Sequence, residues 1–253
     1  MKLNYTNQGA GQPVVLLHGM FGSLSNLGNL ARDLATAYRV ISVDLRNHGD
    51  SPHEQEMGLS AMADDIVDLL DDLDLPRVNL IGHSLGGKIG MQVALNYPSR
   101  VVKLVVVDIA PVAYTPRQDA ALDALRAVSR LNIGSRGQAD AAMAIHLPEP
   151  QTRSFLLKNL KRKDDGSYCL RLNMSSIIEN YGTSLVAAPE GIPYGGPTLF
   201  LKGETSAYIQ SKHQSRMTEL FPNMKLDVMK GVGHWLHAEN PVEFNRRVTD
   251  FLI

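Results

Sequence analysis

One serine in this chain stands in a setting typical of catalytic nucleophiles. The segment Gly82-His83-Ser84-Leu85-Gly86 fits the pattern Gly-x-Ser-x-Gly. In this pattern the serine occupies a sharp turn between a strand and a helix, and the glycines remove side chains that would collide there. The turn places the hydroxyl at a helix N-terminus, where backbone N–H groups point outward. The pentapeptide alone is a weak signal, because glycines also flank serines in ordinary turns. The residues around it therefore decide whether this serine is interpreted as catalytic.

A serine hydroxyl is a poor nucleophile at neutral pH, and it needs a base to remove its proton and an acid to orient that base. The candidate base is His234, in the glycine-rich segment 231–235 between the last expected strand and the last expected helix. Of the other histidines, His237 fits the helix entry, His213 fits a surface helix, and His146 lies in a helical block between two expected strands. We therefore expect His234 to be the base.

The acid has two candidate positions, each after an expected strand. In the loop after the strand 198–201, Ser206 stands where the pattern Gly-x-x-Asp would place an aspartate. A neutral hydroxyl does not stabilise an imidazolium as a carboxylate does. Asp108 follows a run of apolar residues, at the end of a strand where ligands bind in open α/β sheets. We expect Asp108 to be the acid, with Glu204 as the alternative; the other interpretation of Asp108 is a structural acceptor for loop N–H groups.

A serine mechanism also requires an oxyanion hole, in which two backbone N–H groups face the charge that develops on the carbonyl oxygen. The N–H of Leu85, directly after the serine, is one expected donor. The other is expected from the segment 18–22, His-Gly-Met-Phe-Gly, with Met20 favoured over Phe21.

The elements that must position these residues alternate between strand and helix. Short apolar, β-branched runs predict strands buried on both faces, and apolar residues at helical spacing predict the helices between them. This alternation predicts an α/β fold with a mostly parallel sheet and helices on both of its faces. Strands are expected at 14–17, 38–43, 78–81, 104–107, 198–201 and 226–229, and helices at 26–37, 60–73, 88–97 and from about 241.

The alternation stops between about residues 111 and 189. A mostly helical block between two sheet strands is interpreted as an inserted cap, and the proline- and glycine-rich segment 189–197 returns the chain to the sheet. Within the block, helices are expected at 118–130, 139–147, 152–160 and 174–181, with a short strand near 168–172. We therefore divide the chain into an α/β core, residues 1–110 and 186–253, and a cap, residues 111–185.

The composition argues against several classes of function. The 253 residues carry 25 Lys and Arg against 26 Asp and Glu, so neither nucleic acid nor an anionic membrane surface is an expected partner. No apolar run approaches the roughly 20 residues that span a bilayer, and residues 1–13 lack the apolar stretch of a signal peptide. Cys169 is the only cysteine, so we expect no internal disulfide, no cysteine-based metal site and a cytoplasmic location.

Together these motifs resemble the α/β-hydrolase superfamily over nearly the whole chain, and more narrowly the small bacterial esterases of the YbfF type. That subgroup places its acid after the strand that follows the nucleophile helix, which supports Asp108. The resemblance implies an α/β-hydrolase fold, hydrolysis of carboxylic esters or acyl-CoA thioesters, and no metal or organic cofactor. The motifs that carry it are His18-Gly19, Asp44-x-Arg46-x-x-Gly49-x-Ser51, Gly82 to Gly87 and Gly233-His234, with 18–23, 44–49, 86–88 and 108–111 for the subgroup.

We therefore expect a serine esterase that forms an acyl-enzyme on Ser84 and acts on a small-molecule ester or thioester. Cap residues are expected to roof an apolar acyl pocket, although the same residues also suit packing of the cap onto the core. The expected substrate contacts are Phe21, Tyr114, Leu125, Phe155 and Trp235.

Two other functions stay open on the sequence alone. Superfamily members with such a triad also cleave carbon–carbon bonds or act as lyases, and Lys88, Arg117 and Arg126 are candidates to hold a carboxylated substrate. A non-catalytic ligand-binding protein is the second alternative, against which the intact serine and histidine argue. Epoxide hydrolase or dehalogenase chemistry is not expected, because those relatives have an aspartate in place of Ser84.

Overall fold

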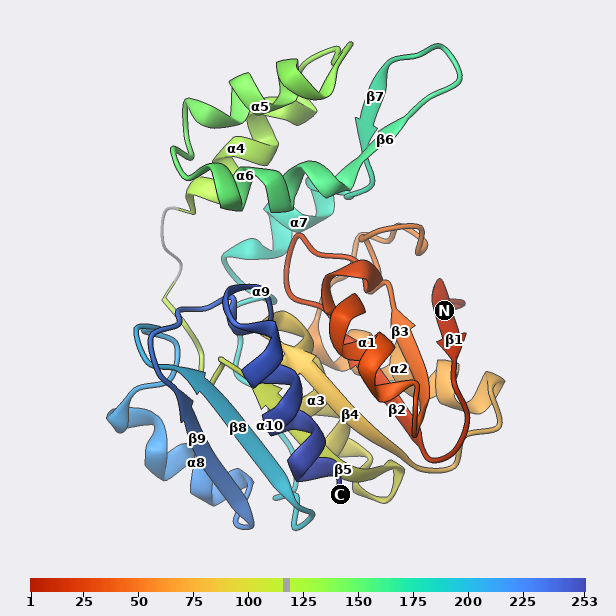
Figure 1. Ribbon diagram of the computed structural model, residues 1–253, viewed down its shortest axis with the longest axis vertical. Coiled ribbons are helices and arrows are strands. Elements are labelled where there is room, and N and C mark those ends of the chain that lie inside the picture. The colour runs from red at the N-terminus through yellow and green to blue at the C-terminus, as the bar shows by residue number, and fades with distance from the viewer. Residues whose placement is uncertain (116–118) are drawn as a thin grey trace.

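A seven-stranded sheet forms the centre of the computed structural model, which describes residues 1–115 and 119–253 (Figure 1). The strand order is β1-β3-β2-β4-β5-β8-β9, and only β1 runs antiparallel to its neighbour. The predicted α/β fold with a mostly parallel sheet is therefore confirmed. The strands are β1 (Tyr5–Gln8), β2 (Pro13–Leu17), β3 (Arg39–Val43), β4 (Val78–His83), β5 (Val101–Val107), β8 (Thr198–Gly203) and β9 (Met224–Met229).

Helices cover both faces of this sheet. Side chains alternate between the faces of a strand, so Val14 and Leu16 of β2 pack on one side and Val15 and Leu17 on the other. Because both faces are buried, the inner strands are mostly apolar. One face is covered by α1 (Gly28–Leu34), α9 (Leu236–Glu239) and α10 (Pro241–Leu252), and the other by α2 (Leu59–Asp72), α3 (Leu85–Asn96) and α8 (Gln214–Leu220).

The first strand and the first helix of the core differ from the sequence-based expectation. The edge strand β1 was not expected, because its four residues are all exposed and show no apolar pattern. It pairs through its backbone with β3, and Arg39 of β3 also donates to the side chain of Asn7. The expected helix 26–37 is a 3-10 helix, Leu24–Leu27, that continues as the shorter α1.

The block between β5 and β8 forms a separate layer that packs over the loops after the parallel strands (Figure 1). The expected strand near 168–172 is one half of a hairpin. The expected helix 118–130 begins at Ala120, because Asp119 is extended and caps it; Gln118 lies outside the described residues. The exact boundaries of this cap stay a prediction. Its elements are α4 (Ala120–Ser129), α5 (Arg136–Ala144), α6 (Pro150–Leu156), a 3-10 helix (Leu157–Asn159), β6 (Leu160–Arg162), β7 (Tyr168–Leu170) and α7 (Met174–Tyr181).

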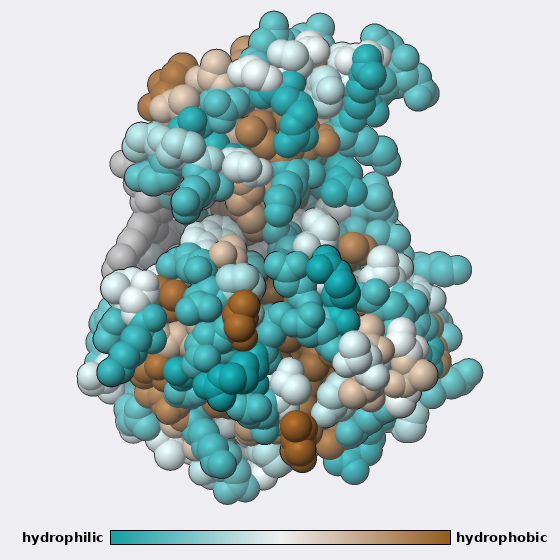
Figure 2. Space-filling view, viewed as in Figure 1, coloured by the Kyte–Doolittle hydropathy of each residue, from teal (hydrophilic) through white to brown (hydrophobic). Residues whose placement is uncertain are grey.

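The surface in view carries hydrophobic side chains in small separate groups among hydrophilic ones (Figure 2). No helix in the described part of the chain has both the length and the apolar character needed to cross a membrane.

Candidate active site

The register of the sheet brings the candidate residues to one edge. In the ladder Leu17 pairs with Gly82, His83 with Val107, and Val107 with Leu201. The loops that follow β2, β4, β5 and β8 therefore leave the sheet side by side. These loops carry the expected oxyanion segment, the serine, Asp108 and Ser206, although the residues are far apart in the chain.

Ser84 occupies the turn between β4 and α3 with a positive φ of 52° and ψ of −113°. The flanking glycines are required by contact distance: a Cβ at Gly82 would lie 2.1 Å from the Gly86 oxygen, and one at Gly86 would lie 2.3 Å from the Leu17 oxygen. The serine is half-buried, and its hydroxyl has no hydrogen-bond partner among the described residues. The turn thus presents a hydroxyl that is free to react. The lack of a hydrogen bond to a base agrees with this role, because catalytic hydrogen bonds often tighten only when substrate binds.

His234 and Asp108 are joined by a hydrogen bond of 2.7 Å between Nδ1 and Oδ2. The Asp108 side chain is fully buried, whereas that of His234 is 19% exposed. Because Nδ1 donates its hydrogen to the carboxylate, the Nε2 atom of a neutral His234 keeps a lone pair that can take a proton. The alternative acid, Glu204, lies in an exposed loop and accepts from the backbone N–H of Gly231.

Ser206 is not the acid, but its side chain is hydrogen-bonded to the carboxylate of Asp108. Its hydroxyl donates to Asp108 Oδ2, and the N–H of Gly203 donates to Oδ1 over 3.0 Å. Three donors thus converge on one buried carboxylate. The sequence indicates only that Ser206 is not the acid. Its position, where an aspartate is expected, is the signal that its side chain lies beside the residue that is.

The two expected oxyanion donors are both available. Leu85 is the first residue of α3, so its N–H has no carbonyl partner within the helix. The N–H of Met20 has no hydrogen-bond partner among the described residues. The alternative donor, the N–H of Phe21, is already bonded to His48 Nε2 at 3.2 Å. The geometry therefore favours Met20 over Phe21.

Two buried histidines brace the oxyanion segment. His48 donates from Nδ1 to the Arg46 carbonyl and accepts at Nε2, while His18 donates to the Gly19 carbonyl and accepts from the N–H of Leu45. Burial lowers the pKa of His18 to about 4 and that of His48 to about 3. Both rings are therefore neutral at pH 7, as an accepting nitrogen requires.

A third buried histidine, His83, holds the loop of the candidate base. Its Nε2 donates to the His234 carbonyl over 2.9 Å, and its ring centroid lies 4.8 Å from that of His234. Burial, followed by the neighbouring His237 and His234, keeps the pKa of His83 well below its usual value. The residue before the serine thus fixes the backbone that carries the base.

The residues expected to contact substrate differ in burial and in distance from the candidate base. Phe155 of the cap packs against Trp235, beside the candidate base, with ring centroids 4.2 Å apart. Tyr114 accepts from the N–H of Ala110 and donates to the Tyr208 carbonyl. Leu125 is fully buried among apolar side chains, and Phe21 is 5% exposed. Contact of any of them with substrate stays a prediction.

The cations considered for a carboxylated substrate are engaged elsewhere where the structure describes them. Lys88 is buried and donates to the carbonyls of Val186 and Ala187, and Arg126 pairs with Asp123. Arg117 lies outside the described residues. No described contact therefore favours the carbon–carbon or lyase alternative.

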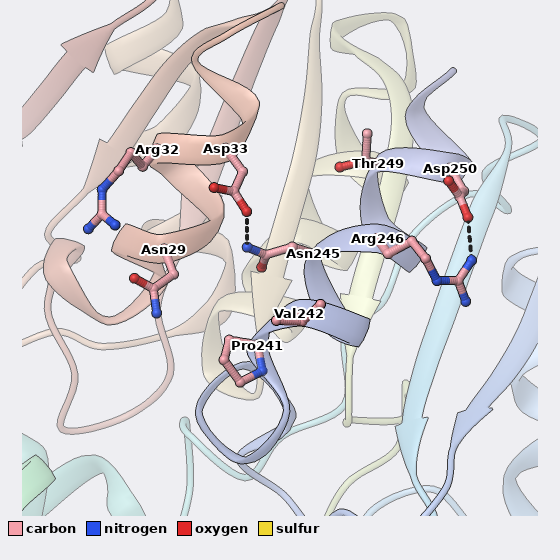
Figure 3. Close-up of a pocket in the computed structure, with 9 residues that line it drawn as sticks. All are labelled: Asn29, Arg32, Asp33, Pro241, Val242, Asn245, Arg246, Thr249 and Asp250. Atoms are coloured by element: carbon pink, nitrogen blue, oxygen red, sulfur yellow. Dashed lines mark hydrogen bonds and ion pairs between the residues drawn. The ribbon is translucent and has the colours of Figure 1, made fainter.

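A surface hollow between α1 and α10 is separate from this site. Figure 3 shows Asn245 bonded to Asp33 across the hollow and Arg246 paired with Asp250. None of the nine lining residues belongs to the candidate active site. Within the described residues, no group of three or more His, Cys, Asp or Glu side chains is arranged to hold a metal ion.

Comparison with known proteins places the chain in a family. The family described as alpha/beta hydrolase fold matches residues 12–241. Esterase YbfF of Escherichia coli (strain K12) is 40% identical, and the alignment covers 100% of this chain and 99% of that protein. The sn-1-specific diacylglycerol lipase ABHD11 of Mus musculus is 39% identical over 94% of this chain and 80% of that protein. A solved structure, "Marine microorganism esterase", superposes with a TM-score of 0.94 at 36% identity, covering 99% of both chains. The chain therefore belongs to the α/β-hydrolase family, in the group that contains the esterase YbfF of E. coli.

Proposed function

We propose that the chain is a serine esterase in which Ser84 is the nucleophile, His234 the general base and Asp108 the acid that orients it. The similarity to an esterase and to a diacylglycerol lipase supports a carboxylic ester hydrolase. The observation that carries the assignment of roles is the 2.7 Å hydrogen bond from His234 to the buried Asp108, at the edge of the sheet where Ser84 occupies a strained turn.

In this mechanism the Ser84 oxygen attacks the acyl carbonyl while His234 Nε2 takes its proton. Asp108 accepts the hydrogen bond from Nδ1–H throughout the reaction and stabilises the imidazolium. The N–H groups of Met20 and Leu85 donate to the oxyanion of the tetrahedral intermediate. His234 then protonates the leaving alkoxide, which departs as an alcohol, and water hydrolyses the acyl-enzyme by the same steps.

The proposed substrates are small-molecule esters with an apolar acyl group, and acyl-CoA thioesters are a second class. The rings of Phe155 and Trp235 support an apolar acyl site, because they lie together next to His234 and join the cap to the core. A thioester would react in the same way, with a thiolate in place of the alkoxide as leaving group.

Hydrolysis of p-nitrophenyl esters of graded chain length tests this function. Wild type should release p-nitrophenol and react with a fluorophosphonate probe, and Ser84→Ala should do neither while its thermal unfolding is unchanged. Ser129→Ala, at an exposed position at the end of a cap helix, is the matched control and should keep full activity. Turnover that persists in Ser84→Ala would contradict the proposal. A folded wild type that binds the probe but hydrolyses no ester would favour carbon–carbon or lyase chemistry.

A further inference from the structure

One side chain of the cap reaches the backbone of the oxyanion segment. Asn159, at the end of the 3-10 helix Leu157–Asn159, donates from Nδ2 to the carbonyl of Phe21 over 2.8 Å. The same amide group donates to the Leu156 carbonyl over 3.1 Å, and Asn159 is only 2% exposed. The two residues lie 138 positions apart, so this bond exists only when the cap is seated on the core.

The backbone that receives this bond has an unfavourable conformation. The N–H of Gly22 donates to the Gly19 carbonyl over 3.0 Å, which closes a turn with Met20 and Phe21 at its centre. Phe21 has a φ of 61°, a value that favours glycine or asparagine at this position of a turn. A phenylalanine keeps this conformation only where the surroundings hold it.

Two side chains from outside the turn hold Phe21. His48, in the loop after β3, accepts from its N–H, and Asn159 donates to its carbonyl. The peptide N–H of Met20, one residue earlier, is left unbonded within the described part of the chain. The direction of this N–H is therefore set by a turn that is hydrogen-bonded to the core through His48 and to the cap through Asn159.

We propose that Asn159 is a positioning residue through which the seated cap holds the oxyanion turn in its catalytic conformation. This inference rests on the proposed function, because it assigns the Met20 N–H to the oxyanion hole. It makes the cap part of the catalytic apparatus as well as a cover for the acyl group. An oxyanion hole formed in this way is complete only when the cap is in place.

The chain offers a matched control for cap attachment. Asn173, also in the cap, donates from Nδ2 to Asn47 Oδ1 of the core over 2.9 Å, and it caps α7 as well. Asn173→Ala therefore removes a similar amide contact between cap and core, together with a helix cap, without touching the oxyanion turn.

The test compares Asn159→Ala and Asn159→Leu with Asn173→Ala, using steady-state ester hydrolysis and inhibition by a trifluoromethyl ketone. A bond that acts only on the transition state lowers kcat and leaves KM unchanged. Loss of one oxyanion donor costs about 100- to 1,000-fold, and we expect a misdirected donor to lower kcat by about 10- to 100-fold. Binding of the ketone, whose adduct is tetrahedral, should weaken by the same factor. The leucine variant fills the space of the amide, so one variant stays informative if the other does not fold.

Three outcomes are distinguishable. A fall in kcat at unchanged KM in the Asn159 variants, with Asn173→Ala within about 3-fold of wild type, supports the inference. Equal losses in the Asn159 and Asn173 variants, or an effect of Asn159 on KM alone, would overturn it. Turnover that persists in Ser84→Ala would instead remove the proposed function on which it rests.

Discussion

Replacing Asp108 by asparagine perturbs the proposed mechanism at its most buried point. The side chain is fully buried and accepts three hydrogen bonds: Gly203 donates to Oδ1, and Ser206 and His234 donate to Oδ2. An amide has nearly the same shape but offers one acceptor oxygen and one NH₂ group. In either orientation its NH₂ group must therefore face a donor.

Both orientations have a cost that can be worked out. If the NH₂ group faces Gly203, a buried N–H loses its acceptor, which costs about 1–3 kcal/mol of unfolding free energy. If it faces His234, the ring must accept at Nδ1 and carry its proton on Nε2, so it cannot take a proton from Ser84. We expect kcat to fall by about 10,000-fold, equivalent to about 5.5 kcal/mol of activation free energy.

Initial rates of p-nitrophenyl ester hydrolysis and urea unfolding measure the two effects separately. Glu204→Gln is the matched control, because it removes a carboxylate from the neighbouring loop and keeps an acceptor for the N–H of Gly231. It should stay within about 3-fold of wild type, as expected for an exposed residue away from the reacting groups. A folded Asp108→Asn with nearly normal kcat, or an equal loss in Glu204→Gln, would refute the assignment of the acid.

Three further predictions follow from the surroundings of the site. Ser206→Ala should lower kcat by about 10- to 100-fold and Ser206→Thr should restore most of it, because a hydrogen bond to a carboxylate is worth about 1.5–3 kcal/mol; equal pH–rate profiles and rates for wild type and alanine variant would exclude this role. Stability should fall as pH drops below about 6.5, because the unfolded chain then binds protons that the buried rings of His18 and His48 do not take up. Each histidine contributes up to about 1.4 kcal/mol per pH unit. The unfolding free energy of His48→Gln, measured in urea, should therefore depend less steeply on pH than that of wild type. Burial lowers the pKa of Lys88 from 10.5 to about 7, so between these values the unfolded chain binds a proton that the folded chain has lost. As pH rises from about 7 to 9, the unfolding free energy of wild type should increase by up to about 1.4 kcal/mol per pH unit relative to that of Lys88→Met. A difference between the two proteins that stays constant with pH would contradict this prediction.

The features predicted correctly are those written in short stretches of sequence. An apolar β-branched run marks a strand buried on both faces, so β2, β4, β5 and β8 were all expected within a few residues of their observed bounds. The residues after these strands could then be proposed as one site, because parallel strands end at the same edge. The fold and the meeting of Asp108 with His234 were accessible for this reason.

The features that were missed depend on the path of the whole chain. The strand β1 is polar and exposed, and only its pairing with β3 defines it. The contact of Asn159 with Phe21 requires that the cap and the core dock in one orientation, and no local pattern at either residue encodes that orientation. The hydrogen bond from Ser206 to Asp108 likewise joins two loops across neighbouring strands. Contacts between distant segments therefore carry the part of the site that sequence patterns do not reveal.

Backbone conformation marks the same site without reference to any family. Five non-glycine residues in the described part of the chain have positive φ: Phe21, Asn47, Asp74, Ser84 and Asp108. All but Asp74 lie in the loops after β2, β3, β4 and β5, next to or within the candidate site. Each costs about 1–3 kcal/mol, which persists only where packing and hydrogen bonds over-determine the conformation. Because unfavourable conformations concentrate where function constrains the chain, their convergence at one edge of the sheet is an independent argument that this edge carries the chemistry.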